Sequence, residues 1–224
     1  MVTGNLFWTQ GTYMLLILVS LIGIGWRWSR FLLYTASIAL FLCFCFFRNP
    51  DRLCVDALYD PNVIVCPADG VVVFAGPDEH MPENLSKMFD KKVAIFMSVF
   101  DVHVNWVPYA GTVESVQLTS GSFLNAMSSD CSQKNERNDV VIRTASGSKM
   151  QIRQIAGLIA RQIVCWVSPQ DTVSGPDNEG RAQKFGMIRF GSRVELFLPP
   201  EAEILVSEGM RVYGGSTVLG RMRS

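Results

Sequence analysis

Two adjacent residues, Gly191 and Ser192, interrupt an apolar segment and could carry out chemistry on the chain itself. The segment FGMIRFGSRVELFLP, at 185–199, partly alternates apolar and polar residues, as a β-strand does. Glycine weakens a strand unless the backbone bends or is closely approached there, so a plain β-bulge is one interpretation. In the other interpretation, the Ser192 hydroxyl lies over the Gly191 carbonyl and attacks it, which requires an acid–base group nearby.

A histidine suited to acid–base chemistry lies in the segment SVFDVHVNWVP, at 98–108. The only other histidine, His80, lies in a polar loop. Asp101, His103 and Asn105 alternate with valines, which predicts three polar side chains on one face of a strand. This face is either a half-exposed polar surface or part of a cleft in which His103 transfers protons.

A carboxylate that could assist such a histidine is Asp69, in the sequence PADG at 67–70. An Asp-Gly pair before an apolar strand is typical of a turn. The same carboxylate could also orient a histidine and stabilise its charge. A further polar cluster, KNERND at 134–139, is interpreted as a solvent-exposed hairpin loop.

Composition excludes several classes of function. The 20 basic residues balance the 20 acidic ones, and no basic cluster with interleaved aromatic residues indicates nucleic acid binding. The six cysteines contain no CxxC pair, so we predict reduced thiols in a cytosol-facing protein and no metal site.

The apolar residues are concentrated near the N-terminus, in two uncharged runs, Tyr13–Trp26 and Phe31–Phe47. As helices of 14 and 17 residues they would be roughly 21 and 26 Å long, which is short for a bilayer core of about 30 Å. Residues 1–48 are therefore predicted to form a membrane-associating helical hairpin. The hairpin either lies shallowly in the bilayer or crosses it with tilt and local thinning.

Residues 49–224 have a different sequence pattern, in which short runs rich in β-forming residues are separated by glycine-containing turns. This pattern predicts a mainly β (α+β) fold, with a compact antiparallel β domain and only a few short helices, one of them around Glu83–Phe89. A domain of this length is large enough to bury one sizeable core.

Taken together, these segments resemble the pyruvoyl-dependent phosphatidylserine decarboxylases in their short bacterial and archaeal form. The resemblance covers essentially the whole chain. Its motifs, beside the N-terminal apolar pair, are FFRNPDR (46–52), PADG (67–70), FMSVFDVHVNWVP (96–108), NERN (135–138) and IRFGSRVELFLP (188–199). The resemblance implies a proenzyme that cleaves itself at Gly191–Ser192. The products would be a β chain, residues 1–191, and an α chain of 224 − 191 = 33 residues.

The resemblance also implies a reaction sequence. The Ser192 hydroxyl converts the preceding amide into an ester, β-elimination breaks the chain, and the resulting dehydroalanine loses ammonia to become a pyruvoyl group. This covalent cofactor forms a Schiff base with the amine of phosphatidylserine and accepts electrons as CO₂ leaves, so that phosphatidylethanolamine results. By the same resemblance, His103 belongs to the acid–base machinery, and Asp69 is its partner carboxylate in self-cleavage.

One position departs from the family pattern. In the segment that corresponds to that of His103, longer members of the family carry the pattern His-x-x-His. Short members usually have a basic residue at the position of the second histidine, and this chain has Trp106 there. His103 could therefore serve self-cleavage, protonation of the decarboxylated product, or both, while Trp106 could line an apolar approach for the lipid. Arg137 and Arg189 are either binding residues for the substrate's phosphate or carboxylate, or ordinary structural arginines.

The resemblance implies a phospholipid substrate, a location at the cell membrane with the catalytic domain facing the cytoplasm, and an α–β heterodimer, with homo-oligomerisation left open. One alternative is decarboxylation of a serine ether lipid, archaetidylserine. Another is a non-catalytic lipoyl- or biotinyl-like module, because PADGVVVFAG and VSEGMRVYGGSTVLG resemble the strands of such modules. The absence of lysine after Lys184 argues against this module.

Overall fold

The computed structural model describes residues 14–23, 30–79, 81–128, 130–157, 162–189 and 192–223. The chain divides into two compact units, Met1–Asn49 and Pro50–Ser224, which are described separately.

The first unit contains two helical segments, residues 14–23 and α2 (Arg30–Phe46), and this confirms the predicted N-terminal pair of helices. Helix α2 has no acidic residue in its first turn and no basic residue in its last. Most of its large apolar side chains are exposed: Phe31, Leu32, Tyr34, Ile38, Phe41, Leu42 and Phe44. Within the described segments, no helix combines the length and the apolar character needed to cross a membrane.

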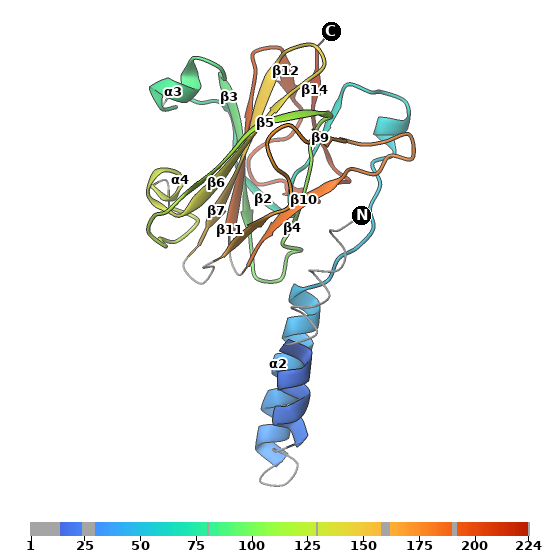
Figure 1. Cartoon of the computed structure of the whole chain (residues 1–224), viewed down its shortest axis with the longest axis vertical. Coiled ribbons are helices and arrows are strands. Elements are labelled where there is room, and N and C mark those ends of the chain that lie inside the picture. Colours follow the sequence, from blue (N-terminus) through green and yellow to red (C-terminus); the bar gives the residue numbers. More distant parts are fainter. Residues whose placement is uncertain are drawn as a thin grey trace. The chain divides into compact units, whose positions relative to one another are not determined.

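The second unit is mainly β, as predicted, and its elements are shown in Figure 1. The strands are β1 (Val63–Val65), β2 (Gly70–Pro77), β3 (Lys91–Met97), β4 (Val104–Trp106), β5 (Gly111–Thr119), β6 (Arg137–Arg143), β7 (Lys149–Ala156), β8 (Ile163–Cys165), β9 (Thr172–Val173), β10 (Lys184–Ile188), β11 (Ser192–Leu198), β12 (Ala202–Ile204), β13 (Arg211–Val212) and β14 (Val218–Met222). Its short helices are η1 (Asp56–Leu58), α3 (Glu83–Ser86) and α4 (Cys131–Lys134). Helix α3 confirms the short helix predicted near Glu83.

The strands form one large sheet and two small ones. The large sheet has the order β13-β2-β3-β11-β7-β6-β5-β9, and the small sheets have the orders β1-β14-β12 and β4-β10-β8. Strand β11 pairs antiparallel with β3 on one side and with β7 on the other, and all of its residues are buried. It is therefore an interior strand of the large sheet.

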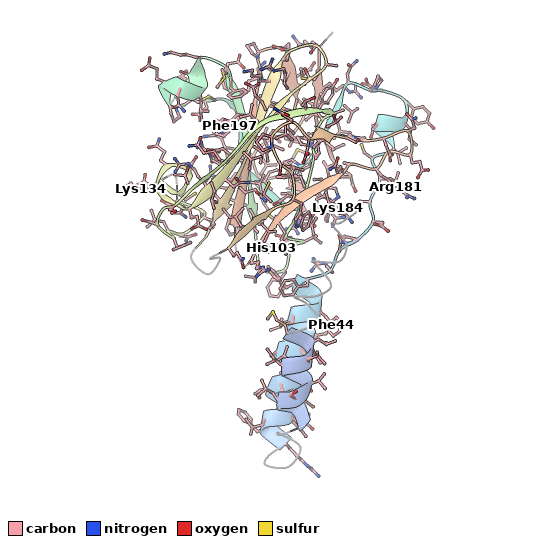
Figure 2. All side chains as sticks on the ribbon, in the orientation of Figure 1. Phe44, His103, Lys134, Arg181, Lys184 and Phe197 are labelled. Atoms are coloured by element: carbon pink, nitrogen blue, oxygen red, sulfur yellow. The ribbon has the colours of Figure 1, made fainter. Side chains whose placement is uncertain are left out.

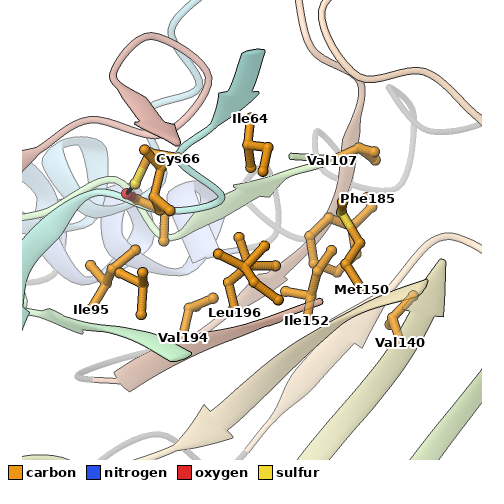
Figure 3. Packing of buried hydrophobic residues seen from close by; sticks show 14 of the residues in the cluster. Ile64, Cys66, Ile95, Val107, Val140, Met150, Ile152, Phe185, Val194 and Leu196 are labelled. Atoms are coloured by element: carbon orange, nitrogen blue, oxygen red, sulfur yellow. Dashed lines mark hydrogen bonds between the residues drawn. The ribbon is translucent and has the colours of Figure 1, made fainter. Parts of the chain in front are cut away.

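The main core lies on one face of the large sheet. Side chains alternate across a strand, so Val194 and Leu196 of β11 point into this core while Arg193 and Glu195 point away from it. Arg193 and Glu195 form a buried ion pair at 2.8 Å on the other face. The packing of the apolar face is shown in Figure 3, whose labelled residues are Ile64, Cys66, Ile95, Val107, Val140, Met150, Ile152, Phe185, Val194 and Leu196.

Two local interpretations of the sequence were wrong. The segment 134–139 is not a solvent-exposed loop, because Asn135 and Asn138 are buried and β6 begins within it. The segment 185–199 is not one strand with a bulge, because β10 belongs to a small sheet and β11 to the large one. The chain therefore passes from the small sheet to the large one between Ile188 and Ser192.

Candidate active site

Strand β11 places Ser192 in the interior of the second unit. Ser192 is the first residue of this strand, has 0% of its surface exposed, and lies opposite Met97 on β3 and Ala156 on β7. Its hydroxyl donates to the Met97 sulfur at 3.3 Å. A thioether is a weak acceptor, so the hydroxyl lies in apolar surroundings without a strong hydrogen bond to this neighbour.

The chain passes between the large sheet and a small sheet twice at the end of the unit where Ser192 lies. Strand β10 leads into β11 through residues 189–191, and β3 leads into β4 through residues 98–103. Because Ser192 lies opposite Met97 and Met187 lies opposite Val104, the strand ends that flank both connections lie at the same end of the unit. There the Ile188 amide donates to the carbonyl of His103 at 3.1 Å. The predicted cleavage partner Gly191 lies outside the described residues.

His103 is buried at this end of the unit (Figure 2), with 1% of its surface exposed. Its Nδ1 lies 2.9 Å from the main-chain carbonyl oxygen of Asp101. A carbonyl oxygen only accepts, so Nδ1 carries the hydrogen and Nε2 has the lone pair that a general base needs. Asp101 and Asn105 are equally buried, so the interpretation of this face as a half-exposed polar surface was wrong.

A chain of buried amides connects the His103 strand with the large sheet. The Gln154 amide donates to Asn105 Oδ1 at 2.8 Å, and the Asn138 amide donates to Gln154 Oε1 at 2.9 Å. Gln154 lies opposite Val194, two residues from Ser192 on the same face of the sheet. Nothing in the sequence distinguished Gln154 from other polar strand residues, and its part in this chain was missed.

Asp69 lies at the same end of the large sheet as Ser192, because it directly precedes β2 and only β3 lies between β2 and β11. Its two carboxylate oxygens accept from the two terminal nitrogens of Arg52, one of them at 2.8 Å. One oxygen also accepts from the Gly214 amide at 2.8 Å. The carboxylate is thus bound to Arg52 and Gly214, and the bidentate Arg52 contact was not predicted.

Trp106, which was predicted to line an apolar approach for the lipid, is buried in the interior of the second unit. It has 1% of its surface exposed, and the Arg52 guanidinium lies 5.1 Å from its ring centroid. A Cβ atom at Gly214 would lie 2.4 Å from this ring, and one at Gly215 would lie 2.8 Å from it. The two glycines therefore leave space for the indole.

The two arginines considered for substrate binding differ in position. Arg137 lies opposite Ile155 on β7, and it therefore points to the face of the sheet opposite to that of Ala156 and Ser192. Arg189 directly follows β10 in the connection that leads to Ser192, and it donates to Gln162 Oε1 at 2.5 Å. Burial lowers the pKa of the Arg189 guanidinium. Arg189 is thus three positions before Ser192 in the chain, whereas Arg137 lies on the opposite face of the sheet.

The thiols are poor competitors for the role of nucleophile. All six cysteines are free, and burial raises the pKa of the Cys66 thiol to about 12. Burial also raises the pKa values of Cys131 and Cys165. Because the thiolate is the reactive form, these thiols are held in an unreactive state.

This fold and this site define a mainly β protein with a buried serine at a sheet crossing and a histidine on the adjacent connection. A family model described as phosphatidylserine decarboxylase matches residues 40–220. The phosphatidylserine decarboxylase proenzyme of Syntrophus aciditrophicus (strain SB) is 47% identical over 193 residues, covering 86% of this chain and 84% of that protein. The chain belongs to the phosphatidylserine decarboxylase family.

Two further relatives carry the same name, phosphatidylserine decarboxylase proenzyme. The protein of Desulfotalea psychrophila (strain LSv54 / DSM 12343) is 42% identical over 178 residues, 79% of this chain and 78% of its own. The protein of Geobacter metallireducens (strain ATCC 53774 / DSM 7210 / GS-15) is 40% identical over 189 residues, 84% of this chain and 80% of its own.

Proposed function

We propose that this chain is a phosphatidylserine decarboxylase proenzyme that cleaves itself between Gly191 and Ser192 and then converts phosphatidylserine into phosphatidylethanolamine and CO₂. The observation that carries the proposal is the burial of the Ser192 hydroxyl at the sheet crossing, beside the connection that contains His103. The family membership supplies the reaction class.

In the proposed self-cleavage, the Ser192 hydroxyl is the nucleophile and His103 Nε2 accepts its proton. The C–N bond of the Gly191–Ser192 peptide breaks as the C–O bond of an ester forms. β-Elimination then removes the Cα proton of Ser192, breaks the ester's C–O bond on the Ser192 side and releases the carboxylate of Gly191. The dehydroalanine that remains takes up water and loses ammonia to give the pyruvoyl group. The Asp101 carbonyl supports this role of His103, because it keeps the hydrogen on Nδ1.

In this proposal, Asp69 is the partner carboxylate in self-cleavage, and its own position is fixed by hydrogen bonds. Its carboxylate binds Arg52 and Gly214, and Gly214 belongs to the segment that becomes the α chain. The predicted function of Asp69 as a partner carboxylate in self-cleavage is thus kept as a proposal, with Arg52 holding the carboxylate in place. Of the two arginine candidates, Arg189 is proposed for the substrate's phosphate or carboxylate, because it lies in the connection that ends at Ser192.

The surroundings of Ser192 fit the predicted pyruvoyl cofactor. Met97, Ala156 and Val194 surround position 192 with apolar side chains and contribute no competing nucleophile. A pyruvoyl group there would supply a carbonyl that binds the substrate amine and withdraws electrons as the carboxylate leaves. His103 would hold or deliver the proton that replaces the carboxylate.

We also propose that residues 1–48 attach the protein to the cell membrane and that residues 49–224 form the decarboxylase domain facing the cytoplasm. The exposed apolar surface of α2 supports an attachment to lipid. The proposed partners are the phospholipid substrate, the membrane, and the two cleaved chains for each other.

The two alternative functions are not favoured. The compared relatives are named for phosphatidylserine, and none of their names mentions an ether lipid or a lipoyl or biotinyl carrier.

The decisive test is the mass of the purified chain, compared with that of Ser192→Ala. The native protein is expected to give two chains on a denaturing gel, the smaller one starting at position 192 without a free amine. Ser192→Ala is expected to remain one chain and to lose decarboxylation, because alanine has no nucleophile. An active preparation that consists of a single continuous chain of 25.0 kDa would refute the proposal.

A further inference from the structure

The buried carboxylate of Asp101, two residues before His103, pairs with the exposed side chain of Arg211. The side chain of Asp101 is 1% exposed, and its carboxylate accepts from an Nη of Arg211, whose own side chain is 45% exposed. The other carboxylate oxygen accepts from the Ser98 amide at 2.7 Å, and the Asp101 amide donates to the Ser98 carbonyl at 3.0 Å. Asp101 thus closes the turn 98–101 with both its main chain and its side chain.

The same residue orients the imidazole. The Asp101 carbonyl oxygen accepts from His103 Nδ1 at 2.9 Å, so the position of this turn influences where the ring lies and favours the hydrogen on Nδ1. A hydrogen bond from the ring nitrogen that does not react helps to set both the tautomer and the orientation of a reactive histidine. If the turn moves, both properties of His103 change.

The cation of the pair comes from a distant part of the chain. Arg211 lies on β13, opposite Val71 of β2, and is separated from Asp101 by 110 positions. Cleavage before Ser192 would leave Asp101 and His103 in the large chain and Arg211 in the small one. The Asp101–Arg211 pair would therefore connect the two chains at the turn that precedes His103.

We propose that Arg211 and Asp101 are positioning residues for His103, with Arg211 holding the buried Asp101 carboxylate and thereby the turn that orients the imidazole. The proposal rests on the function proposed above, in which His103 moves protons. Without Arg211 the buried carboxylate keeps only the Ser98 amide, which is too little compensation for a charge away from water. The turn then shifts toward solvent, and the Asp101 carbonyl no longer holds Nδ1.

The first experiment reads the tautomer of His103 directly. The chain has 2 histidines, so the full-length Ser192→Ala protein labelled with ¹⁵N-histidine gives two imidazole spin systems, which His80→Gln assigns. In this uncleaved background we expect His103 to be hydrogenated at Nδ1. Adding Arg211→Gln is expected to mix the two tautomers.

Arg221→Gln is the matched control. Arg221 lies on β14 in the same segment, its side chain is 49% exposed, and it pairs with Asp60 at 3.3 Å, away from His103. This variant is expected to leave the His103 tautomer and the turnover unchanged. If Arg211→Gln fails to fold, Asp101→Ala takes its place, because alanine removes both the pair with Arg211 and the side-chain contact to the Ser98 amide that closes the turn.

The second experiment measures turnover by the processed protein. Arg211→Gln is expected to lower kcat about ten- to a hundredfold with KM unchanged, which is part of the contribution of a general acid–base. Arg211→Lys is expected to restore part of kcat, because it returns the charge. An unchanged Nδ1 tautomer in a folded Arg211→Gln protein, or in Asp101→Ala where that variant takes its place, would overturn the positioning role. A native protein that is folded but neither cleaves itself nor decarboxylates phosphatidylserine would instead reject the proposed function, and the tautomer would still decide the inference.

Discussion

At the scale of single residues, the candidate site combines the Ser192 hydroxyl, in apolar surroundings, with the His103 imidazole, whose Nδ1 contacts a main-chain carbonyl. The Ser192 hydroxyl has the Met97 sulfur as its acceptor, and the His103 ring has a carbonyl oxygen at Nδ1. Neither of these two contacts involves a charge. A variant that keeps the Nδ1 contact and removes Nε2 therefore tests the acid–base role.

His103→Asn is such a variant, because the asparagine side-chain amide can donate to the Asp101 carbonyl much as Nδ1 does but has no group that titrates near neutral pH. We expect self-cleavage, turnover or both to fall by about 10²–10⁴-fold, the usual contribution of general acid–base catalysis. Self-cleavage is followed by the appearance of the small chain on a denaturing gel, and turnover by CO₂ release. Normal rates of both steps in a stably folded variant would exclude His103 from the acid–base machinery.

Ser192, His103 and Asp69 could be proposed as site residues from the sequence because each lies in a distinctive local motif. The roles of Arg52 and Arg211 could not, because their partners are defined only by the fold. Asp101 and Arg211 are separated by 110 positions, and no periodicity relates them. The burial of His103 was also not predictable, since alternation shows that residues share a face but not what covers that face.

At the scale of secondary-structure elements, the site is built where strands pass from one sheet to another. The sequence predicted strands on both sides of Gly191–Ser192 correctly, but it did not show that β10 and β11 belong to different sheets. The same holds for β3 and β4, which are separated by the connection that carries His103. Apolar alternation identifies a strand, whereas its sheet depends on pairing partners far away in the chain.

The turn after β13 depends on close packing against Trp106, and this gives a prediction at the element scale. In Gly214→Ala the new methyl group would overlap the buried indole, and we expect a loss of about 1–3 kcal/mol in the free energy of unfolding, as is typical of overpacking. Denaturant unfolding measures this loss.

Trp106→Leu provides the control background, because it removes the ring atoms that the new methyl group would meet. There Gly214→Ala is expected to destabilise less than in the native chain, which a double-mutant cycle measures as a coupling energy. Equal losses in both backgrounds would show that the indole is not what requires glycine at this position.

At the scale of the whole molecule, residues 192–224 are distributed among the sheets and do not form a separate layer. Strand β11 lies between β3 and β7 in the large sheet, β13 extends the same sheet beside β2, and β14 pairs with β1 in a small sheet. Leu196, Val212 and Leu219 of this segment belong to the same apolar core as residues of the preceding chain. Breaking the backbone before Ser192 would therefore leave almost all of the packing in place.

We expect the cleaved protein to remain one folded unit in which the two chains separate only when the domain unfolds. The small chain has no stable fold to adopt by itself, because β11 would lose its pairing partners on both sides. Gel filtration in detergent, followed by a denaturing gel of each fraction, measures whether the 33-residue piece (224 − 191) stays with the large chain on dilution. The uncleaved Ser192→Ala protein is the reference for elution volume and for the cooperativity of thermal unfolding. Loss of the small chain under native conditions, with the large chain still folded, would mean that the backbone link and not the strand pairing holds this segment in the sheet.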